Sequence, residues 1–355
     1  MSLKSAPKLS RYFENQMLLT SLIGLMALLL SIRVFAATVA LTGAGSTFVE
    51  PVMTKWISEY QKKDASVSVN YQGIGSGGGI RQLSAGTVDF GASDAPMTAD
   101  EEKGAQKPVV HIPTVLGAVV VSYNLKLEKP LKLDGTTVAD IFSGKITVWN
   151  DARIQKLNAG VKLPETAITV ATRSDGSGTT AVFSDYLAKV SKDWVGKAGK
   201  TVDWFHGSVG AKGNAGVAGL IKQSEGTVGY VELVYAAENK LPFATLLNKH
   251  GDLVEASTKS VSLAAGGKVV ELMTKNDFKL SITNSDAAGA YPISSFSWLL
   301  IYDGMAKEKG QPLLDMVKWA LTDSAQDMAS SMNYAPLPKA LREKVLARLS
   351  KVKVN

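Results

Sequence analysis

The sequence predicts an α/β protein with two lobes, each a mostly parallel sheet flanked by helices. Two observations predict this class. Short β-rich apolar runs alternate with stretches of helical periodicity along most of the chain. In addition, three turns rich in Gly, Ser and Thr each stand between a predicted strand and a predicted helix: 43–48, 73–79 and 175–180. Because ligands of open α/β sheets bind beyond the carboxyl ends of the strands, these turns predict the ligand site.

Before residue 125 the pattern predicts four strands, with helices between the first three. The strands are expected at 38–41, 67–71, 88–94 and 111–124. The helices are expected at 51–62, where Pro51 suits the first turn, and at 80–84. The last strand is long and apolar, as expected for a central strand that crosses between lobes.

After residue 125 the alternation continues. Helices are expected at 138–142, 180–190, 232–238, 313–321 and 337–352, and strands at 168–172, 226–231 and 291–302. Residues 248–268 have weak periodicity, so we expect a loop and a short helix there.

The two long apolar runs predict how the chain is divided. Each suits a strand that crosses from one lobe to the other. We therefore expect residues 125–290 to form an inserted lobe, and residues 37–124 together with 291–355 to form the other lobe.

Residues 1–36 resemble a signal peptide. A basic start is followed by the apolar run 17–32, and Val34-Phe35-Ala36 offers small residues before a cleavage site at Ala37. The run is shorter than the roughly 20 residues of a membrane span. Arg33 leaves an uncleaved anchor as the alternative. We expect export to the periplasm without a lipid anchor, because the chain has no Cys.

Composition excludes several functions. The chain carries a formal net charge of +7, and about +4 without residues 1–36, with no Lys/Arg run suited to nucleic acid. With no Cys, disulfides, thiolate metal sites and a Cys nucleophile are excluded. We expect no metal and no cofactor.

The three Gly-rich turns predict a cage for a small anion. Glycine lets backbone N–H groups converge, Ser and Thr add hydroxyl donors, and each helix start adds N–H groups and the positive end of its dipole. Arg173 and Asp175 flank the third turn. An exposed pair there would contribute under about 1 kcal/mol. In a cage, Arg173 would instead be the cation on the anion, with Asp175 fixing its planar guanidinium.

Asp94 narrows the ligand. It stands at a strand end, where an Asp is commonly a helix cap. Beside two anion turns, its carboxylate would repel an anion unless that anion carries a proton to donate. Phosphate carries one near neutral pH, whereas sulfate does not.

Two other classes are weighed and disfavoured. Residues 73–78 formally match the dinucleotide fingerprint, but nicotinamide cofactors are not expected outside the cytoplasm. A serine hydrolase would need a histidine base for Ser76 or Ser177. We expect the three histidines of the chain, His111, His206 and His250, to have neither a carboxylate partner nearby nor metal-ligand spacing.

Several segments closely resemble the periplasmic phosphate-binding proteins of phosphate-specific ABC transporters. The likeness runs through most of the chain after residue 36, and its clearest stretches are 41–48, 70–79, 88–96, 140–146, 175–179, 226–232 and 334–338. Ser46, Gly77 and the pair Val49-Glu50 depart from the usual pattern.

The resemblance implies a two-lobed periplasmic-binding-protein (Venus-flytrap) fold that closes on dehydrated phosphate. It implies eight phosphate-binding residues: Thr47, Phe48, Ser76, Asp94, Arg173, Ser177, Gly178 and Thr179. Thr47 and Phe48 would donate backbone N–H groups, Asp94 would accept the phosphate proton, and Asp175 would support Arg173.

The implied function is phosphate transport by a monomeric carrier, not an enzyme, that delivers its ligand to the inner-membrane permease subunits of an ABC importer. The alternatives are a carrier of another protonated oxyanion, such as arsenate, and a secreted phosphate-ester hydrolase.

Overall fold

The computed structural model describes residues 38–267 and 269–355, so the predicted signal peptide lies outside the described residues. Residues Val39–Asn355 form one compact unit. Among the described residues, no helix combines the length and apolar character needed to cross a membrane.

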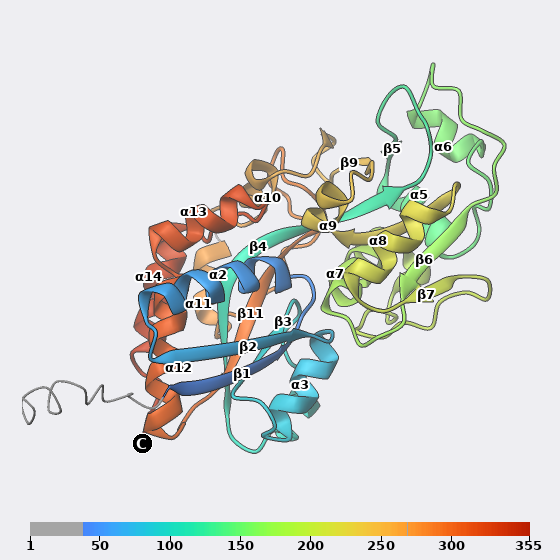
Figure 1. Cartoon of the computed structure of the whole chain (residues 1–355). Helices are drawn as coiled ribbons and strands as arrows, with labels where there is room; N and C mark the ends of the chain where they lie inside the picture. Colours follow the sequence, from blue (N-terminus) through green and yellow to red (C-terminus); the bar gives the residue numbers. More distant parts are fainter. Residues whose placement is uncertain (1–37, 268) are drawn as a thin grey trace, which may run out of the picture. The chain divides into compact units, whose positions relative to one another are not determined.

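The core of this unit is an eight-stranded sheet with the order β2-β1-β3-β11-β4-β8-β6-β7 (Figure 1). The strands are β1 (Val39–Gly45), β2 (Val67–Gly73), β3 (Phe90–Ser93), β4 (Val109–Tyr123), β6 (Thr169–Arg173), β7 (Val209–Ala211), β8 (Thr227–Glu232) and β11 (Ser294–Tyr302). β1 pairs in parallel with β2 and β3, and β6 pairs in parallel with β7 and β8. β11 and β4 are antiparallel and join these two parallel groups. A small second sheet contains β5 (Lys132–Leu133), β9 (Thr245–Leu247) and β10 (Leu253–Val254).

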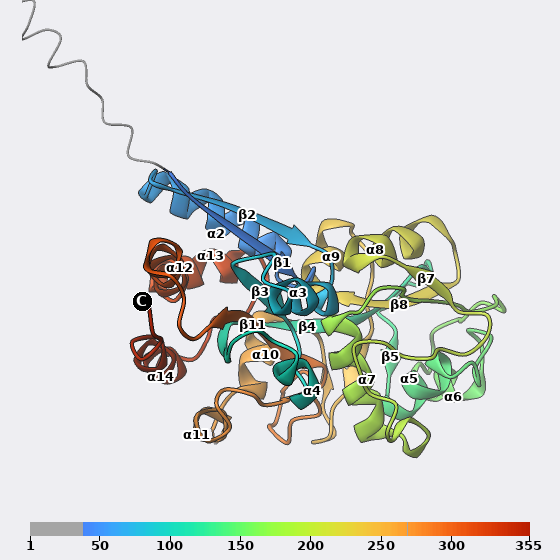
Figure 2. The same ribbon diagram turned by 90° about the horizontal axis from the view of Figure 1, so that it is seen from below.

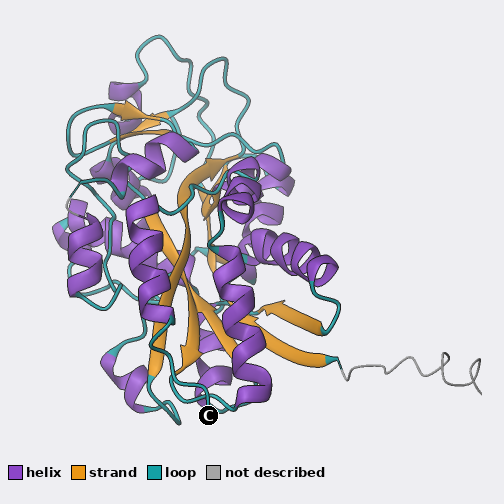
Figure 3. Ribbon diagram, turned by 90° about the vertical axis from the view of Figure 1, so that its left-hand side faces the viewer, coloured by secondary structure: helices purple, strands orange, loops and turns teal. Residues whose placement is uncertain are grey.

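Helices pack against the strands, as Figure 3 shows. The first seven described α-helices in chain order are α2 (Glu50–Lys63), α3 (Ser76–Ser84), α4 (Ala99–Lys103), α5 (Gly135–Phe142), α6 (Ala152–Leu157), α7 (Gly178–Val190) and α8 (Gly213–Gln223). They are followed by α9 (Leu233–Glu238), α10 (Thr258–Ala264), α11 (Val269–Lys275), α12 (Lys307–Ala320), α13 (Asp323–Ser331) and α14 (Lys339–Leu349), and a short 3₁₀ helix spans Lys192–Trp194. The predicted α/β class is confirmed.

Some predicted boundaries are wrong. The second Gly turn is itself the first turn of α3, which begins at Ser76 and not at 80, because its glycines lie buried against neighbouring backbone. The predicted loop at 248–268 contains β10 as well as α10. Other α-helices and strands without a counterpart among the predicted elements are α4, α6, α8, α11, α13, β5, β7 and β9.

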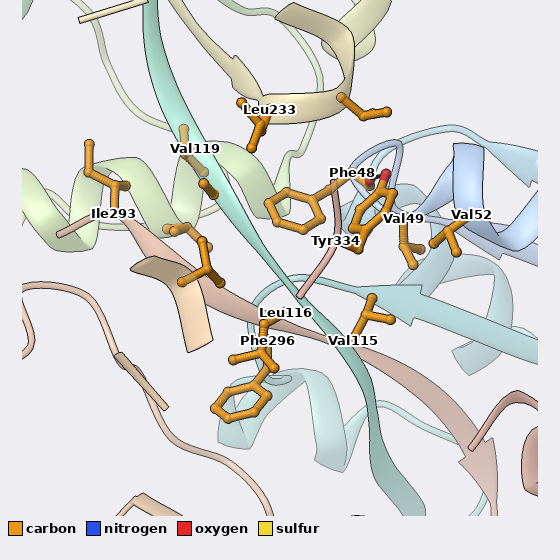
Figure 4. Close-up of a cluster of buried hydrophobic side chains, with 14 of the residues drawn as sticks. Phe48, Val49, Val52, Val115, Leu116, Val119, Leu233, Ile293, Phe296 and Tyr334 are labelled. Carbon is orange, nitrogen blue, oxygen red and sulfur yellow. Dashed lines mark hydrogen bonds between the residues drawn. The ribbon is translucent and has the colours of Figure 1, made fainter. Parts of the chain in front are cut away.

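The strand β4 connects the two parallel groups, because it pairs with β11 at one end and with β8 at the other. Its residues 109–118 pair with β11, and its residues 119–123 pair with β8. All of β4 after Val109 is buried, which explains its largely apolar sequence. Phe48, Leu233, Phe296 and Tyr334 contribute to the buried cluster around β4 in Figure 4.

The segment 258–290 packs against elements of the two chain ends. α10 contacts β4 and β11, and α11 contacts α14 (Figure 2). The indole Nε1 of Trp298 in β11 donates to the carbonyl oxygen of Phe278 at 2.7 Å. The predicted lobe boundaries stay a prediction. The contacts of segment 258–290 concern the second predicted boundary, the one after residue 290.

Candidate functional site

The three Gly-rich turns meet at the carboxyl ends of β1, β2 and β6. The Gly77 N–H donates to the Gly176 carbonyl at 2.9 Å, which joins the second turn to the third. A Cβ on Gly178 would lie 2.3 Å from Ser76 Oγ and 2.5 Å from Asp94 Oδ2. Only glycine therefore permits this approach between the start of α7 and the turn that carries Ser76.

In the first turn, the carbonyl groups of residues 46–48 each accept a hydrogen bond from a tyrosine hydroxyl. The hydroxyls of Tyr71, Tyr235 and Tyr334 donate to the carbonyls of Ser46 (2.8 Å), Thr47 (2.5 Å) and Phe48 (2.6 Å), in that order. Because these carbonyl oxygens are already hydrogen-bonded to tyrosines, an anion at this turn meets N–H and O–H donors rather than carbonyl acceptors. The sequence reasoning missed these tyrosines, because they come from β2, α9 and the segment before α14.

Phe48 has two roles in this turn. Its ring is fully buried and packs near Tyr334, with 6.4 Å between ring centroids (Figure 4). Its N–H, which we predicted to bind the anion, donates to Ser46 Oγ at 2.9 Å. An anion would therefore share this donor with Ser46.

Asp94 follows β3 and is only 2% exposed. Ser46 Oγ lies 2.6 Å from each of its carboxylate oxygens, and Ser297 Oγ donates to Oδ1 at 2.8 Å. Ser76 Oγ is more distant, at 3.4 Å from Oδ2. Burial raises the pKa of Asp94 to about 6, and the hydroxyls of Ser46 and Ser297 and the charge of Arg173 oppose that rise.

Arg173 ends β6, and its side chain is 1% exposed. It binds Asp175 through two parallel hydrogen bonds, Nε to Oδ1 at 2.7 Å and Nη2 to Oδ2 at 2.5 Å. Nη1 donates to Thr179 Oγ1 at 3.3 Å. Within the described part of the chain these bonds use three of the five guanidinium N–H donors, which leaves two for a ligand. The pair that we predicted is therefore formed and buried.

Asp175 holds this arrangement in its ionised form. Burial raises the pKa of Asp175, but the hydrogen bonds and charge of Arg173 and the Gly213 N–H outweigh it and leave the pKa below its usual value. The Gly213 N–H donates to Asp175 Oδ1 at 3.0 Å. Asp175 thus ties β6 to the start of α8.

The third turn is the N-terminus of α7. Ser177 is the N-cap, and its Oγ accepts the Thr180 N–H at 3.0 Å. Gly178 and Thr179 occupy the first turn of the helix and are buried. Their N–H groups have no partner within an α-helix, and the helix dipole adds positive potential beside Arg173.

Asn214, in the first turn of α8, belongs to the site although the sequence reasoning missed it. Its Nδ2 donates to Thr47 Oγ1 at 3.0 Å and to Thr179 Oγ1 at 3.1 Å. Thr47 Oγ1 also accepts the Asn214 N–H at 3.2 Å, and Thr179 Oγ1 also accepts from Arg173. Both lone pairs of each hydroxyl are then filled, so each threonine has its proton to donate.

A signal for Asn214 was present. Residues 210–216, which run from the end of β7 into the first turn of α8, are rich in small residues. This is the same pattern that identified the three Gly-rich turns.

Two specific arrangements, a histidine base for Ser76 or Ser177 and a metal-binding cluster, are not found in the described residues. There, neither Ser76 nor Ser177 is hydrogen-bonded to a histidine, and His111 Nε2 accepts the Met97 N–H at 3.0 Å. The expectation that the histidines have no carboxylate nearby is wrong for two of them, because His250 Nδ1 lies 3.2 Å from Asp252 Oδ2 and His111 Nδ1 lies 3.8 Å from Glu102 Oε1. Burial lowers the pKa of His111 to about 4. No cluster of His, Cys, Asp and Glu suited to a metal ion occurs in residues 38–267 and 269–355.

Two parallel α/β groups joined through antiparallel strands, with a buried donor-lined site at their strand ends, define a solute-binding protein of the two-lobed class. Residues 36–323 match the model of the PBP superfamily domain. The phosphate-binding protein PstS of Xylella fastidiosa is 41% identical over 316 residues, which cover 87% of this chain and 85% of the relative. PstS of Pasteurella multocida is 41% identical over 333 residues, covering 91% and 94%.

A solved structure agrees in fold. The phosphate-binding protein of Stenotrophomonas maltophilia superposes with a TM-score of 0.66 at 20% identity, covering 88% of this chain and 94% of that one. The chain therefore belongs to the PBP superfamily and, within it, to the PstS family of phosphate-binding proteins. The family predicted from the sequence is confirmed.

Proposed function

We propose that this protein captures inorganic phosphate in the site around Asp94 and Arg173 and delivers it to the permease subunits of an ABC importer. The observation that carries the proposal is that the buried Asp94 carboxylate lies against the start of α7, where the buried Arg173 guanidinium and the hydroxyls of Thr47 and Thr179 are also held. An anion that has charge for Arg173 and a proton for Asp94 satisfies both groups. The names of the PstS relatives support the same ligand.

The proposed contacts follow from the free donors. Thr47 and Thr179 donate their hydroxyl protons, because Asn214 fills both lone pairs of Thr47 Oγ1, and Asn214 and Arg173 together fill those of Thr179 Oγ1. The remaining proposed contacts are the hydroxyls of Ser76 and Ser177, the N–H groups of Phe48, Gly178 and Thr179, and two N–H groups of Arg173. Asp94 accepts the proton of the anion, and Asp175 orients Arg173 without touching the anion.

Two lobes hold the anion between them in this proposal. The contacts of segment 258–290 favour a second boundary near residue 257 rather than 290, so that this segment joins the lobe of the chain ends. Lys200 Nζ then reaches from the inserted lobe to Glu101 at 2.8 Å and to the Pro96 carbonyl at 3.2 Å. We infer that this contact helps to hold the two lobes closed.

The carrier acts as an exported periplasmic monomer and performs no covalent chemistry in this proposal. Its mildly basic charge and its relatives' names support a small-anion ligand rather than nucleic acid. Arsenate carries protons near neutral pH as phosphate does, so it remains the second candidate ligand.

Calorimetric titration of ligand-stripped protein with phosphate and arsenate at pH 7.5 tests the proposal. We expect one-to-one binding of phosphate in the titration. In a separate activity assay, we expect no release of alcohol from a phosphate monoester. Absence of phosphate binding would overturn the proposal. Turnover of the monoester would favour the hydrolase alternative.

A further inference from the structure

Ser46 departs from the family pattern, and the structure gives it a specific set of contacts. It is 1% exposed and lies in the first turn, one residue before Thr47. Its Oγ accepts the Phe48 N–H at 2.9 Å and lies 2.6 Å from both Asp94 oxygens. Because a carboxylate only accepts hydrogen bonds, the single hydroxyl proton of Ser46 is donated to Asp94.

Other groups also face Asp94, from several elements. Ser297 on β11 donates to Oδ1, and Ser76 at the start of α3 lies 3.4 Å from Oδ2. Arg173 on β6 is the cation that favours the ionised carboxylate.

Three other weak acids lie close enough to Asp94 to interact with its charge: Glu232 at the end of β8, Tyr71 on β2 and Tyr334 before α14. Burial raises the pKa of all three well above their usual values. The two tyrosines are therefore uncharged at neutral pH, and burial favours the uncharged form of Glu232. Ser46 is the hydroxyl with the shortest contacts to the carboxylate.

We propose that Ser46 is a specificity-determining residue, whose hydroxyl keeps the buried Asp94 in its ionised, proton-accepting form and so excludes oxyanions that carry no proton. The inference rests on the proposed function, and it assigns Ser46 a positioning role toward Asp94 rather than contact with the anion. An ionised Asp94 repels sulfate. A protonated Asp94 donates to a sulfate oxygen and removes that barrier.

The consequence is a pH profile. Sulfate binding follows the protonated fraction of Asp94, which grows as the pH falls toward about 6. Losing one hydrogen bond to a charged carboxylate raises the pKa by about one unit. Ser46→Ala is therefore expected to bind sulfate about tenfold more tightly than the wild type near pH 8. Near pH 5 the two proteins are expected to bind sulfate equally, because Asp94 is then protonated in both.

The experiment measures sulfate as a competitor of labelled phosphate from pH 5 to pH 8.5 on the wild type, Ser46→Ala and Ser297→Ala. Ser297→Ala removes the other close donor and should shift the profile in the same direction, which keeps the test valid if Ser46→Ala folds poorly. Ser295→Ala is the matched control. Ser295 is also a buried β11 serine, but its hydroxyl binds the main-chain carbonyls of Asp94 and Phe296, not the carboxylate. Its profile should match the wild type.

The outcomes separate the two proposals. A sulfate profile displaced to higher pH in Ser46→Ala, with phosphate still bound at pH 8, supports the inference. Superimposable profiles, or no competition by sulfate in either protein at any pH, would overturn it while leaving phosphate binding intact. A wild type that does not bind phosphate overturns the proposed function instead.

Discussion

Replacing Arg173 by Ala removes the buried guanidinium that faces Asp94 and the start of α7. The two N–H donors that remain for a ligand would each form a charge-assisted hydrogen bond with the anion. Such bonds contribute about 1.5–3 kcal/mol each. Their loss is worth about 3–6 kcal/mol, so phosphate affinity should fall roughly 10²–10⁴-fold.

The assay is calorimetric titration with phosphate, supported by thermal denaturation to verify folding. Arg153→Ala is a suitable control, because Arg153 is also paired with aspartates, Asp140 and Asp151, but its side chain is 44% exposed. It should bind phosphate like the wild type. Arg173→Lys keeps the charge but loses the planar fork, so an intermediate affinity is expected. If Arg173→Ala folds and binds phosphate within about threefold of the wild type, the role assigned to the guanidinium is refuted.

Three further changes test the remaining parts of the site. The pKa of Asp94 is about 6 when folded, above its usual value of 3.8, so folding takes up a proton between these values and the free energy of unfolding falls as the pH rises through them. Asp94→Asn should therefore raise the melting temperature of the unliganded protein relative to the wild type at pH 7.5 but not at pH 3.5. Equal shifts of the melting temperature at both pH values would contradict the argument that burial raises this pKa. The same variant should also bind phosphate with a smaller preference over sulfate than the wild type has. Asn214→Ala removes the donor that orients both threonine hydroxyls, so phosphate affinity should fall about 10–100-fold with the sulfate preference unchanged, and unaltered calorimetric affinity would count against it. Gly178→Ala places a Cβ against the second turn and should weaken phosphate binding about tenfold or more, whereas Gly219→Ala in α8, where a Cβ meets open space, should have no effect on the same titration.

The sequence was sufficient for those parts of the site that depend on local pattern. Asp94 follows β3 and Arg173 ends β6, and each follows the rule that ligands bind beyond the carboxyl ends of strands. The two strands run in opposite directions, and their carboxyl ends face each other where β4 changes its partner from β11 to β8. Asp175 is two residues from Arg173, so their pairing could be expected from chain geometry alone. The glycines of the turns also predicted the site, because only glycine positions allow backbone segments to approach each other closely.

The missed residues depend on tertiary packing between distant segments. Ser297 reaches Asp94 across 203 positions of sequence, and Tyr334 reaches the carbonyl of Phe48 across 286. No local pattern relates a tyrosine to a carbonyl that far away. Ser46 was noticed only as a departure from a family pattern, because the sequence does not tell where its hydroxyl points.

The most direct test of the account is a high-resolution crystal structure of the protein soaked with phosphate. We predict one phosphate with an oxygen within hydrogen-bond distance of an Asp94 carboxylate oxygen, and another within that distance of the Arg173 guanidinium. The Asp94 contact should be a short bond that includes the phosphate proton. A phosphate bound elsewhere, or one whose oxygens avoid Asp94, would contradict the central claim that this site selects a protonated oxyanion.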